Sequence, residues 1–149
     1  MAENLLTAPI IESARILSLI PQKPPFVMVD ALFEYTDLTG ITGFIIPEDN
    51  ILVKDDIFSE PGIIEHMAQS MSLHRGYQGF LGGLDKPRTG FIGVIKSVEI
   101  FELPKAGTRL RTYVEILHEV MNVTSVSART EDENGTVLAV SEMKTVTVD

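Results

Sequence analysis

The sequence predicts an α+β domain in which one long helix lies against an antiparallel sheet. Two observations carry this prediction. Residues 59–79 have the start signals and the apolar period of a buried helix, and the chain beyond residue 90 is rich in β-branched and alternating segments, as strands are. Runs of strands beside a single helix are typical of α+β domains. With 149 residues, 44% of them hydrophobic, residues 1–149 are expected to form a single domain.

The central helix begins with a favourable N-cap, Ser59, followed by Glu60 near the positive end of the helix dipole and Pro61 in the first turn. At about 100° per residue, one stripe of the helix is apolar and a neighbouring strip is polar or small. We expect a buried helix whose polar strip faces a ligand or partner; the alternative is a core helix with a solvated acid. The apolar stripe holds Ile64, Met67, Ala68 and Met71, and the polar strip holds Glu65, Gln69, Ser72 and Gly76.

The segments before and after this helix follow from local signals. Apolar residues at helical spacing predict a short helix over residues 7–20, which Pro21 ends. Extended patterns predict strands over 26–35 and 40–46, joined by a turn at 37–40. Polar or glycine-containing composition predicts a loop at 47–56 and another at 80–89.

The remaining chain is predicted to be almost entirely strand. Two turn signals carry the most information, a Pro-Lys-Ala-Gly turn at 104–107 and the Asn134-Gly135 pair, which strongly favours a hairpin. A third tight turn is expected at 119–122. The predicted strands are 91–101, 108–119, 123–131 and 136–148.

Composition excludes several classes of function. The chain has no cysteine, which excludes disulfides, a thiol nucleophile and thiolate metal ligands. A net charge of −9 argues against general nucleic-acid binding. No run approaches the ~20 apolar residues that span a membrane, and the first residues lack a basic signal region. We therefore expect a cytoplasmic protein that binds neither nucleic acid nor membrane.

The three histidines offer little chemistry by themselves. His66, His74 and His118 form no HxH or HxxxH pair, so no metal site is expected, and no cofactor is indicated. His66 points about 100° away from Glu65, and His74 lies roughly 13 Å further along the helix. Neither is expected to pair with Glu65 within one chain. A structural role is the preferred interpretation of each histidine, with His118 at the surface.

Three segments together resemble a known family. Residues 60–70 (EPGIIEHMAQS) are similar to the helix motif of the β-hydroxyacyl-acyl carrier protein dehydratases, which have the hotdog fold. Residues 20–30 (IPQKPPFVMVD) are similar to that family's opening motif LPHRxPFLLVD. Residues 90–112 are similar to a later part of the family's sequence, where a strand, a turn and a second strand follow one another. The resemblance implies a curved antiparallel sheet wrapped around a central helix. It also implies a role in fatty acid or polyketide type metabolism.

The resemblance assigns roles to four residues. In the family, the carboxylate that matches Glu65 helps a β-hydroxyl leave as water, while a histidine from the other chain of a dimer removes the α-proton. The amides near Gly62 and Ile63 would bind the thioester carbonyl, and Gln69 matches the motif's glutamine. The histidine segment GHFPxxPxxPG is absent, because residues 54–62 read KDDIFSEPG. Gln22 also stands where the opening motif usually has histidine.

Three functions therefore remain open. The first is a dehydratase-like enzyme acting on β-hydroxyacyl thioesters of acyl carrier protein or CoA, with Glu65 as the acid. The second is a non-catalytic or half-site subunit that binds acyl chains and pairs with a histidine-bearing hotdog partner. The third is an acyl thioesterase. In each case we expect a homodimer or higher oligomer and an apolar tunnel beside Glu65 and Gln69.

Overall fold

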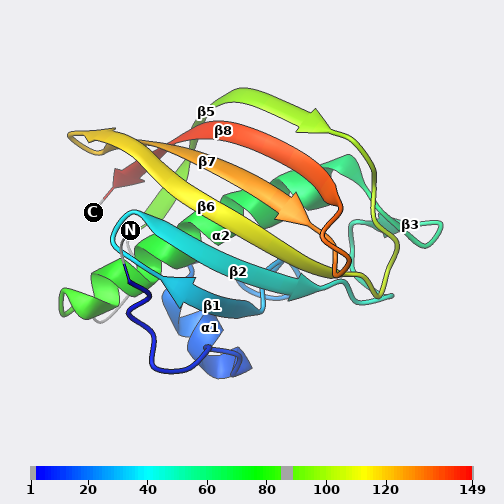
Figure 1. Cartoon of the computed structure of the whole chain (residues 1–149), viewed down its shortest axis with the longest axis horizontal. Helices are drawn as coiled ribbons and strands as arrows, with labels where there is room; N and C mark the ends of the chain where they lie inside the picture. Colours follow the sequence, from blue (N-terminus) through cyan, green and yellow to red (C-terminus); the bar gives the residue numbers. More distant parts are fainter. Residues whose placement is uncertain (1–2, 85–88, 149) are drawn as a thin grey trace.

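A six-stranded antiparallel sheet curls around one long helix, and a shorter helix packs beside it (Figure 1). The computed structural model describes residues 3–84 and 89–148. The strand order in the sheet is β1-β2-β6-β7-β8-β5, and two short strands, β3 and β4, pair separately. The helices are α1 (Ser13–Leu19) and α2 (Glu60–Leu81), and the strands are β1 (Ala31–Tyr35), β2 (Thr39–Ile45), β3 (Val53–Lys54), β4 (Ile57–Phe58), β5 (Thr89–Ile100), β6 (Arg109–Val120), β7 (Val123–Glu131) and β8 (Val137–Val148).

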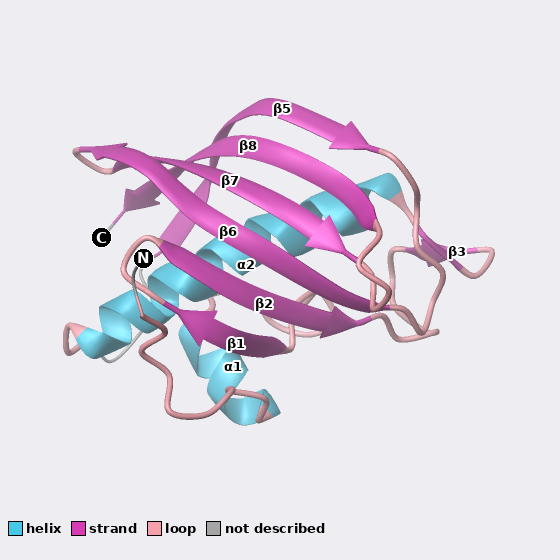
Figure 2. Cartoon of the chain, in the orientation of Figure 1, coloured by secondary structure: helices cyan, strands magenta, loops and turns pink. Residues whose placement is uncertain are grey.

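The sheet and its helix confirm the α+β class, and the curved sheet around α2 is the hotdog arrangement that the resemblance implied (Figure 2). All pairings within the large sheet are antiparallel. The concave face of the sheet and α2 enclose the larger core cluster, which includes Met67, Met71, Leu110 and Met143. A second cluster joins α1, β1 and the later half of α2 through Ile16, Leu32, Tyr35 and Leu73.

The central helix begins where the sequence predicted and ends slightly later. Ser59 has the extended N-cap conformation, but its hydroxyl donates to Leu52 O at 2.7 Å and caps no amide of α2. Pro61 occupies the first turn, where its missing N–H costs nothing. After Leu81 the chain turns through Gly83, whose φ of +92° suits glycine. Residues 85–88 of the predicted loop 80–89 lie outside the described residues, and Thr89 already belongs to β5.

The predicted helix at 7–20 is wrong in its first half. Only Ser13–Leu19 is helical, because the preceding residues pair with the outer edge of β1. Leu5 N donates to Tyr35 O at 2.8 Å, and Ile10 and Leu32 exchange two main-chain hydrogen bonds of 2.9 Å. The helical spacing of the apolar residues is local, whereas this pairing supplies main-chain partners from a distant strand.

Two other predicted segments also differ from the structure because of contacts with distant residues. The predicted strand 26–35 is regular only from Ala31, because side chains of α2 take the main-chain groups of residues 26–28. The predicted loop 47–56 contains β3, which forms a small hairpin with β4. The strands predicted at 40–46, 91–101, 108–119, 123–131 and 136–148 are confirmed to within about two residues.

The two edges of the large sheet differ. The N-terminal arm covers the edge at β1, whereas no described segment pairs with the outer edge of β5. Val94 and Ile95 on β5 are 52% and 47% exposed. Within the described residues, no helix is long and apolar enough to cross a membrane.

Candidate active site

Glu65 lies half-buried on α2, where its carboxylate is held by a neighbouring amide. Gln69, one turn later, donates from Nε2 to Glu65 Oε1 at 2.8 Å. The same Nε2 donates to Phe26 O at 2.7 Å, and Gln69 Oε1 accepts from Met28 N at 2.6 Å. Gln69 is fully buried, and both of its amide hydrogens have partners. It therefore ties Glu65 and the segment 26–28 together, and its amide is not free for a ligand.

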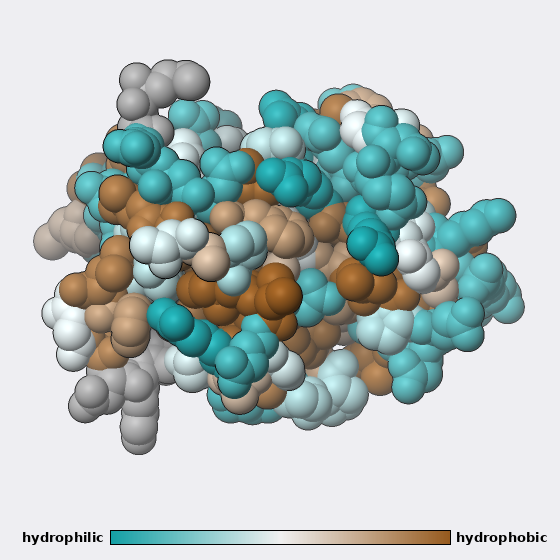
Figure 3. Space-filling view, turned by 60° about the horizontal axis from the view of Figure 1, so that its bottom comes forward, coloured by the Kyte–Doolittle hydropathy of each residue, from teal (hydrophilic) through white to brown (hydrophobic). Residues whose placement is uncertain are grey.

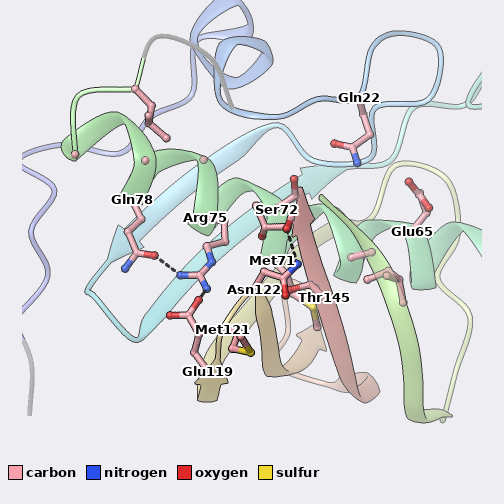
Figure 4. Close-up of a pocket in the computed structure, with 17 residues that line it drawn as sticks. Gln22, Glu65, Met71, Ser72, Arg75, Gln78, Glu119, Met121, Asn122 and Thr145 are labelled. Atoms are coloured by element: carbon pink, nitrogen blue, oxygen red, sulfur yellow. Dashed lines mark hydrogen bonds and ion pairs between the residues drawn. The ribbon is translucent and has the colours of Figure 1, made fainter. Parts of the chain in front are cut away.

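A cleft of about 620 Å³ begins at Glu65 and runs along one face of α2 (Figure 4). On the helix it is lined by Glu65, Ala68, Ser72, Arg75 and Gly79, whose spacing of three and four residues places them on one face. These positions span 14 residues, or about 21 Å of helix. The opposite wall comes from the β6–β7 turn and strands β8 and β5, through Met121, Asn122, Thr145 and Ile92.

The cleft lies where the sequence predicted an apolar tunnel beside Glu65 and Gln69 only in part. It borders Glu65 as expected, whereas Gln69 is buried behind the helix surface and is not among the residues that line it. Figure 3 shows exposed apolar side chains gathered between hydrophilic ones on the lower face of the molecule. Among the described residues 3–30, the exposed large apolar side chains are those of Leu5, Ile11 and Phe26.

A charged cluster lies in the half of the cleft that is farther from Glu65. Arg75 forms an ion pair with Glu119 and donates to Gln78 Oε1 at 2.6 Å and to Thr124 Oγ1 at 2.5 Å. Figure 4 shows this group at the opposite end of the view from Glu65. Sequence reasoning noticed Ser72 on the polar strip but missed Arg75. The available signal was the position of Arg75 three residues after Ser72, which places the two on neighbouring parts of the helix surface.

The first turn of α2 offers one amide rather than two. Ile63 N already donates to Ser59 O at 3.1 Å, as in an ordinary helix. Gly62 is buried against the ring of Phe58, and a Cβ added there would come within 2.5 Å of that ring. Glycine is therefore required at position 62 by close packing. Its N–H, in the first turn of α2, belongs to the group of amides that helices leave without an intrahelical partner.

The two histidines of α2 are buried and point away from the cleft. His66 Nδ1 lies 2.6 Å from Met28 O and its Nε2 lies 2.7 Å from Thr112 Oγ1. Since a carbonyl only accepts, Nδ1 carries the proton and Nε2 accepts from Thr112. Burial lowers the pKa of His66 to about 4, so the ring is neutral near pH 7.

His74 and His118 also have structural contacts. His74 Nε2 lies 2.8 Å from Thr36 O, and burial lowers the pKa of this histidine as well. His118 is exposed on β6, with Nε2 3.2 Å from Ser125 Oγ. None of the three lines the cleft beside Glu65. The structural interpretation of the histidines is confirmed.

Gln22 enters the cleft from the loop between α1 and β1. It lines the same cleft as Glu65, and Figure 4 shows its amide turned towards the cleft from above α2. Its Oε1 is buried and has no hydrogen-bond partner in the described part of the chain. Sequence reasoning noted Gln22 only as a departure from the opening motif. Among the described residues, no group of three or more histidine, aspartate or glutamate side chains is placed to hold a metal ion.

Comparison with known proteins gives a family and a set of similar folds. The family model for ApeP-like proteins, described as ApeP dehydratase, matches residues 14–149. No curated protein sequence matches the chain. Among solved structures, the dehydratase heterocomplex ApeI:P from Xenorhabdus doucetiae contains a chain with a TM-score of 0.79 and 18% identity, with 90% of this chain and 91% of that chain covered.

Two further solved structures share the fold at lower identity. A hypothetical thioesterase with coenzyme A from Streptococcus pneumoniae has a TM-score of 0.63 and 10% identity, covering 78% of this chain and 84% of that chain. The E. coli PaaI protein has a TM-score of 0.63 and 7% identity, covering 77% and 80%. At these identities the likeness concerns the fold.

Proposed function

Because the chain belongs to the ApeP-like dehydratase family, we propose that it provides the carboxylate half of a site that dehydrates 3-hydroxyacyl thioesters. The histidine base comes from a second hotdog chain. One observation carries this division of labour: Glu65 opens onto a cleft that none of the chain's three histidines lines. Elimination needs both an acid and a base, so a chain with only the acid needs a partner.

Glu65 acts as the acid in this proposal. Gln69 Nε2 donates to Glu65 Oε1, which makes that oxygen an acceptor and leaves Oε2 to carry the proton. Oε2 then gives its proton to the β-hydroxyl oxygen, which leaves as water. The partner's histidine takes the α-proton, and the double bond forms between the α and β carbons. Gln69 thus serves as a positioning residue rather than as a substrate ligand.

The thioester carbonyl is held at the start of α2. The Gly62 N–H supplies the hydrogen bond there, and the positive end of the helix dipole favours the charge that develops on the oxygen. Ile63 is left out of this role, because its amide is occupied by Ser59 O. Pro61 has no N–H, so Gly62 provides the first available amide after Glu60.

The acyl chain extends along α2 in the cleft. About 21 Å of helix separates Glu65 from Gly79, which suits an extended chain rather than a short acyl group. Ala68, Met71, Ile92 and Met121 provide apolar contacts along this path. Burying such a chain is favourable by about 0.8 kcal/mol per methylene. The thiol carrier, acyl carrier protein or CoA, lies beyond the open end at Glu65.

The partner joins at β5. A 12-residue strand with exposed Val94 and Ile95 and no described partner on its outer edge is a surface that proteins normally cover. The dehydratase heterocomplex ApeI:P, whose fold this chain shares, is by its name an assembly of different chains. A second hotdog domain joined through β5 would continue the sheet. It would also bring its own residues towards α2.

The proposal is tested with a panel of 3-hydroxyacyl pantetheine thioesters. The purified protein should turn them over weakly or not at all. Activity should appear when a hotdog chain with a GHFP segment is added. Glu65→Gln should lower the activity of the mixture about 10²–10⁴-fold, because the acid is lost. Hydration or dehydration is followed by absorbance of the enoyl thioester.

Glu60→Gln is the matched control. Glu60 lies on the same helix but is exposed and outside the cleft, so its variant should retain activity. Robust turnover by the lone protein that survives Glu65→Gln would contradict both the half-site and the choice of acid. Release of free thiol instead of an enoyl product would favour a thioesterase.

A further inference from the structure

The helical wall of the cleft changes from uncharged to charged along its length. In the two turns after Glu65, α2 presents Ala68, Met71 and Ser72 to the cleft, and none of these side chains carries a charge. Arg75 follows ten residues after Glu65, or about 15 Å along the helix. An acyl chain that starts at Glu65 therefore meets small or apolar side chains of the helix before it meets a cation.

Arg75 connects the two walls of the cleft. It extends from α2 to Glu119 at the end of β6, with which it forms an ion pair (Figure 4). The buried Thr124 supports the pair from β7, because its Oγ1 accepts from Arg75 at 2.5 Å and donates to Glu119 Oε2 at 3.0 Å. Gln78 Oε1 accepts from Arg75 at 2.6 Å, and Gln78 Nε2 donates to Asp37 O at 3.3 Å. The ion pair is thus held by contacts on both walls.

An alkyl chain gains affinity in the first part of the cleft and loses that gain at the ion pair. Each methylene buried against apolar surface raises affinity about fourfold. The side chains of Arg75 and Glu119 are 29% and 46% exposed, so water still reaches both charges. A chain that passes them has to exclude this water or separate the two charges, and either is unfavourable.

We propose that the pair of Arg75 and Glu119 sets the upper length of the acyl chain. An extended chain advances about 1.3 Å per carbon for single C–C bonds of about 1.5 Å, so about 15 Å holds about 12 carbons beyond the hydroxyl carbon at Glu65. The limit is then about 15 carbons in all. The last four residues to Gly79, about 6 Å of helix, lie beyond it. The proposal rests on the proposed function in that the latter places the acyl chain in this cleft.

Binding of unreactive ligands of increasing length tests the limit. The ligands are 3-hydroxyacyl pantetheine amides with 8 to 20 carbons, measured by competition with a fluorescent acyl ligand below their aggregation concentrations. The measurement is made on the protein and on its complex with the histidine-bearing chain. Affinity for the unaltered protein should rise about fourfold per methylene and level off at about 14 to 16 carbons. Binding is measured instead of turnover, so the length limit and the dehydration can fail separately.

The variant Arg75→Met/Glu119→Leu replaces the pair by apolar side chains and leaves neither charge unpaired. The rise in affinity should then continue to about 18 carbons, where this variant should bind about tenfold more tightly than the unaltered protein does. The exchanged variant Arg75→Glu/Glu119→Arg keeps both charges and should retain the limit. Arg111→Met/Glu34→Leu is the matched control, because it removes an ion pair of 3.6 Å that lies outside the cleft and should leave the profile unchanged.

Two results would overturn the proposal. One is an affinity that rises without a break to 20 carbons in the unaltered protein, which needs no substitution to observe. The other is an unchanged break in Arg75→Met/Glu119→Leu, with a melting curve that shows this variant to be folded. If no ligand of any length binds the protein or the complex, the proposed function itself fails, and the length limit falls with it.

Discussion

At the scale of single residues, the polar side chains of α2 divide between structure and cleft. His66 and Gln69 lie within one turn, and together they bind both main-chain groups of Met28. The buried hydrogen bonds continue beyond His66, because the hydroxyl oxygens of Thr112 and Thr130 lie 2.7 Å apart. Glu65, one residue before His66, faces the cleft instead. The helix thus uses neighbouring residues for opposite purposes, because successive side chains point about 100° apart.

The buried His66 predicts a pH-dependent stability. Its pKa is about 4 when folded and near 6.5 when unfolded, so between these values the unfolded chain binds more protons. The free energy of unfolding should therefore fall as the pH drops from 6.5 to 4, by about 3 kcal/mol from this residue. His74, whose pKa is also lowered, acts in the same direction. Burial raises the pKa of Asp30, which favours the folded state at low pH and offsets part of the loss.

Urea unfolding at several pH values measures this effect. His66→Gln should flatten the slope between pH 4 and 6.5, whatever its effect on stability at pH 7. The control is His118→Gln, which removes an exposed histidine and should leave the slope as it is. A His66→Gln slope equal to that of the unaltered protein would show that His66 is not held neutral.

At the scale of elements, the contact of α1 with α2 depends on a position without a side chain. Gly76 faces the main chain of Leu19 at the end of α1, where the chain turns towards Gln22. No rearrangement of side chains can relieve a Cβ placed 1.7 Å from a main-chain oxygen. The same close approach sets the distance between the two helices and the position of the loop over the cleft.

Gly76→Ala should therefore destabilise the protein. Overpacking costs about 1–3 kcal/mol, which exceeds the gain of up to about 1 kcal/mol from replacing a helical glycine by alanine. Gly79→Ala is the matched control: its Cβ would meet only the flexible end of Leu84 at 3.0 Å, so helix propensity should make it neutral or stabilising. Chemical denaturation of both variants measures the difference. Equal stability of the two would mean that α1 shifts freely on α2.

At the scale of the whole molecule, the exposed edge at β5 is the feature that a lone chain leaves incomplete. The N-terminal arm protects the opposite edge at β1, and no described segment does so at β5. Figure 1 shows β5 as the outermost strand on its side of the sheet. An open, partly apolar edge of this length invites pairing with another sheet.

We expect the protein by itself to form at least a dimer through β5. Such an interface should bury more than about 1,600 Å² in total, enough to persist at micromolar concentration. Ile95→Lys should weaken the dimer, since a lysine on an edge strand opposes pairing. Leu38→Lys, at an equally exposed position in the β1–β2 turn, should not. Sedimentation of the unaltered protein as a monomer would refute the prediction.

The sequence by itself determined the elements whose signals are local. The N-cap, first-turn proline and helical period of residues 59–79 predicted α2, and Asn134-Gly135 and the alternating strands predicted the hairpins of the sheet. These signals work because dihedral preferences and side-chain period act within a few residues. The hotdog fold and the choice of Glu65 came from motif resemblance, since no local pattern separates a solvated acid from a functional one.

Tertiary structure alone decided the rest of the candidate site. Residues 5–10 extend along β1 instead of forming a helix, because main-chain partners 20 to 30 residues away outweigh a weak helical period. Gln69 is occupied by the segment 26–28, more than 40 residues distant, and Gln22 lines the cleft from a loop that begins where Leu19 packs on Gly76. Contacts between residues so far apart in the sequence depend on how the elements pack, and the local sequence pattern around either residue does not predict them.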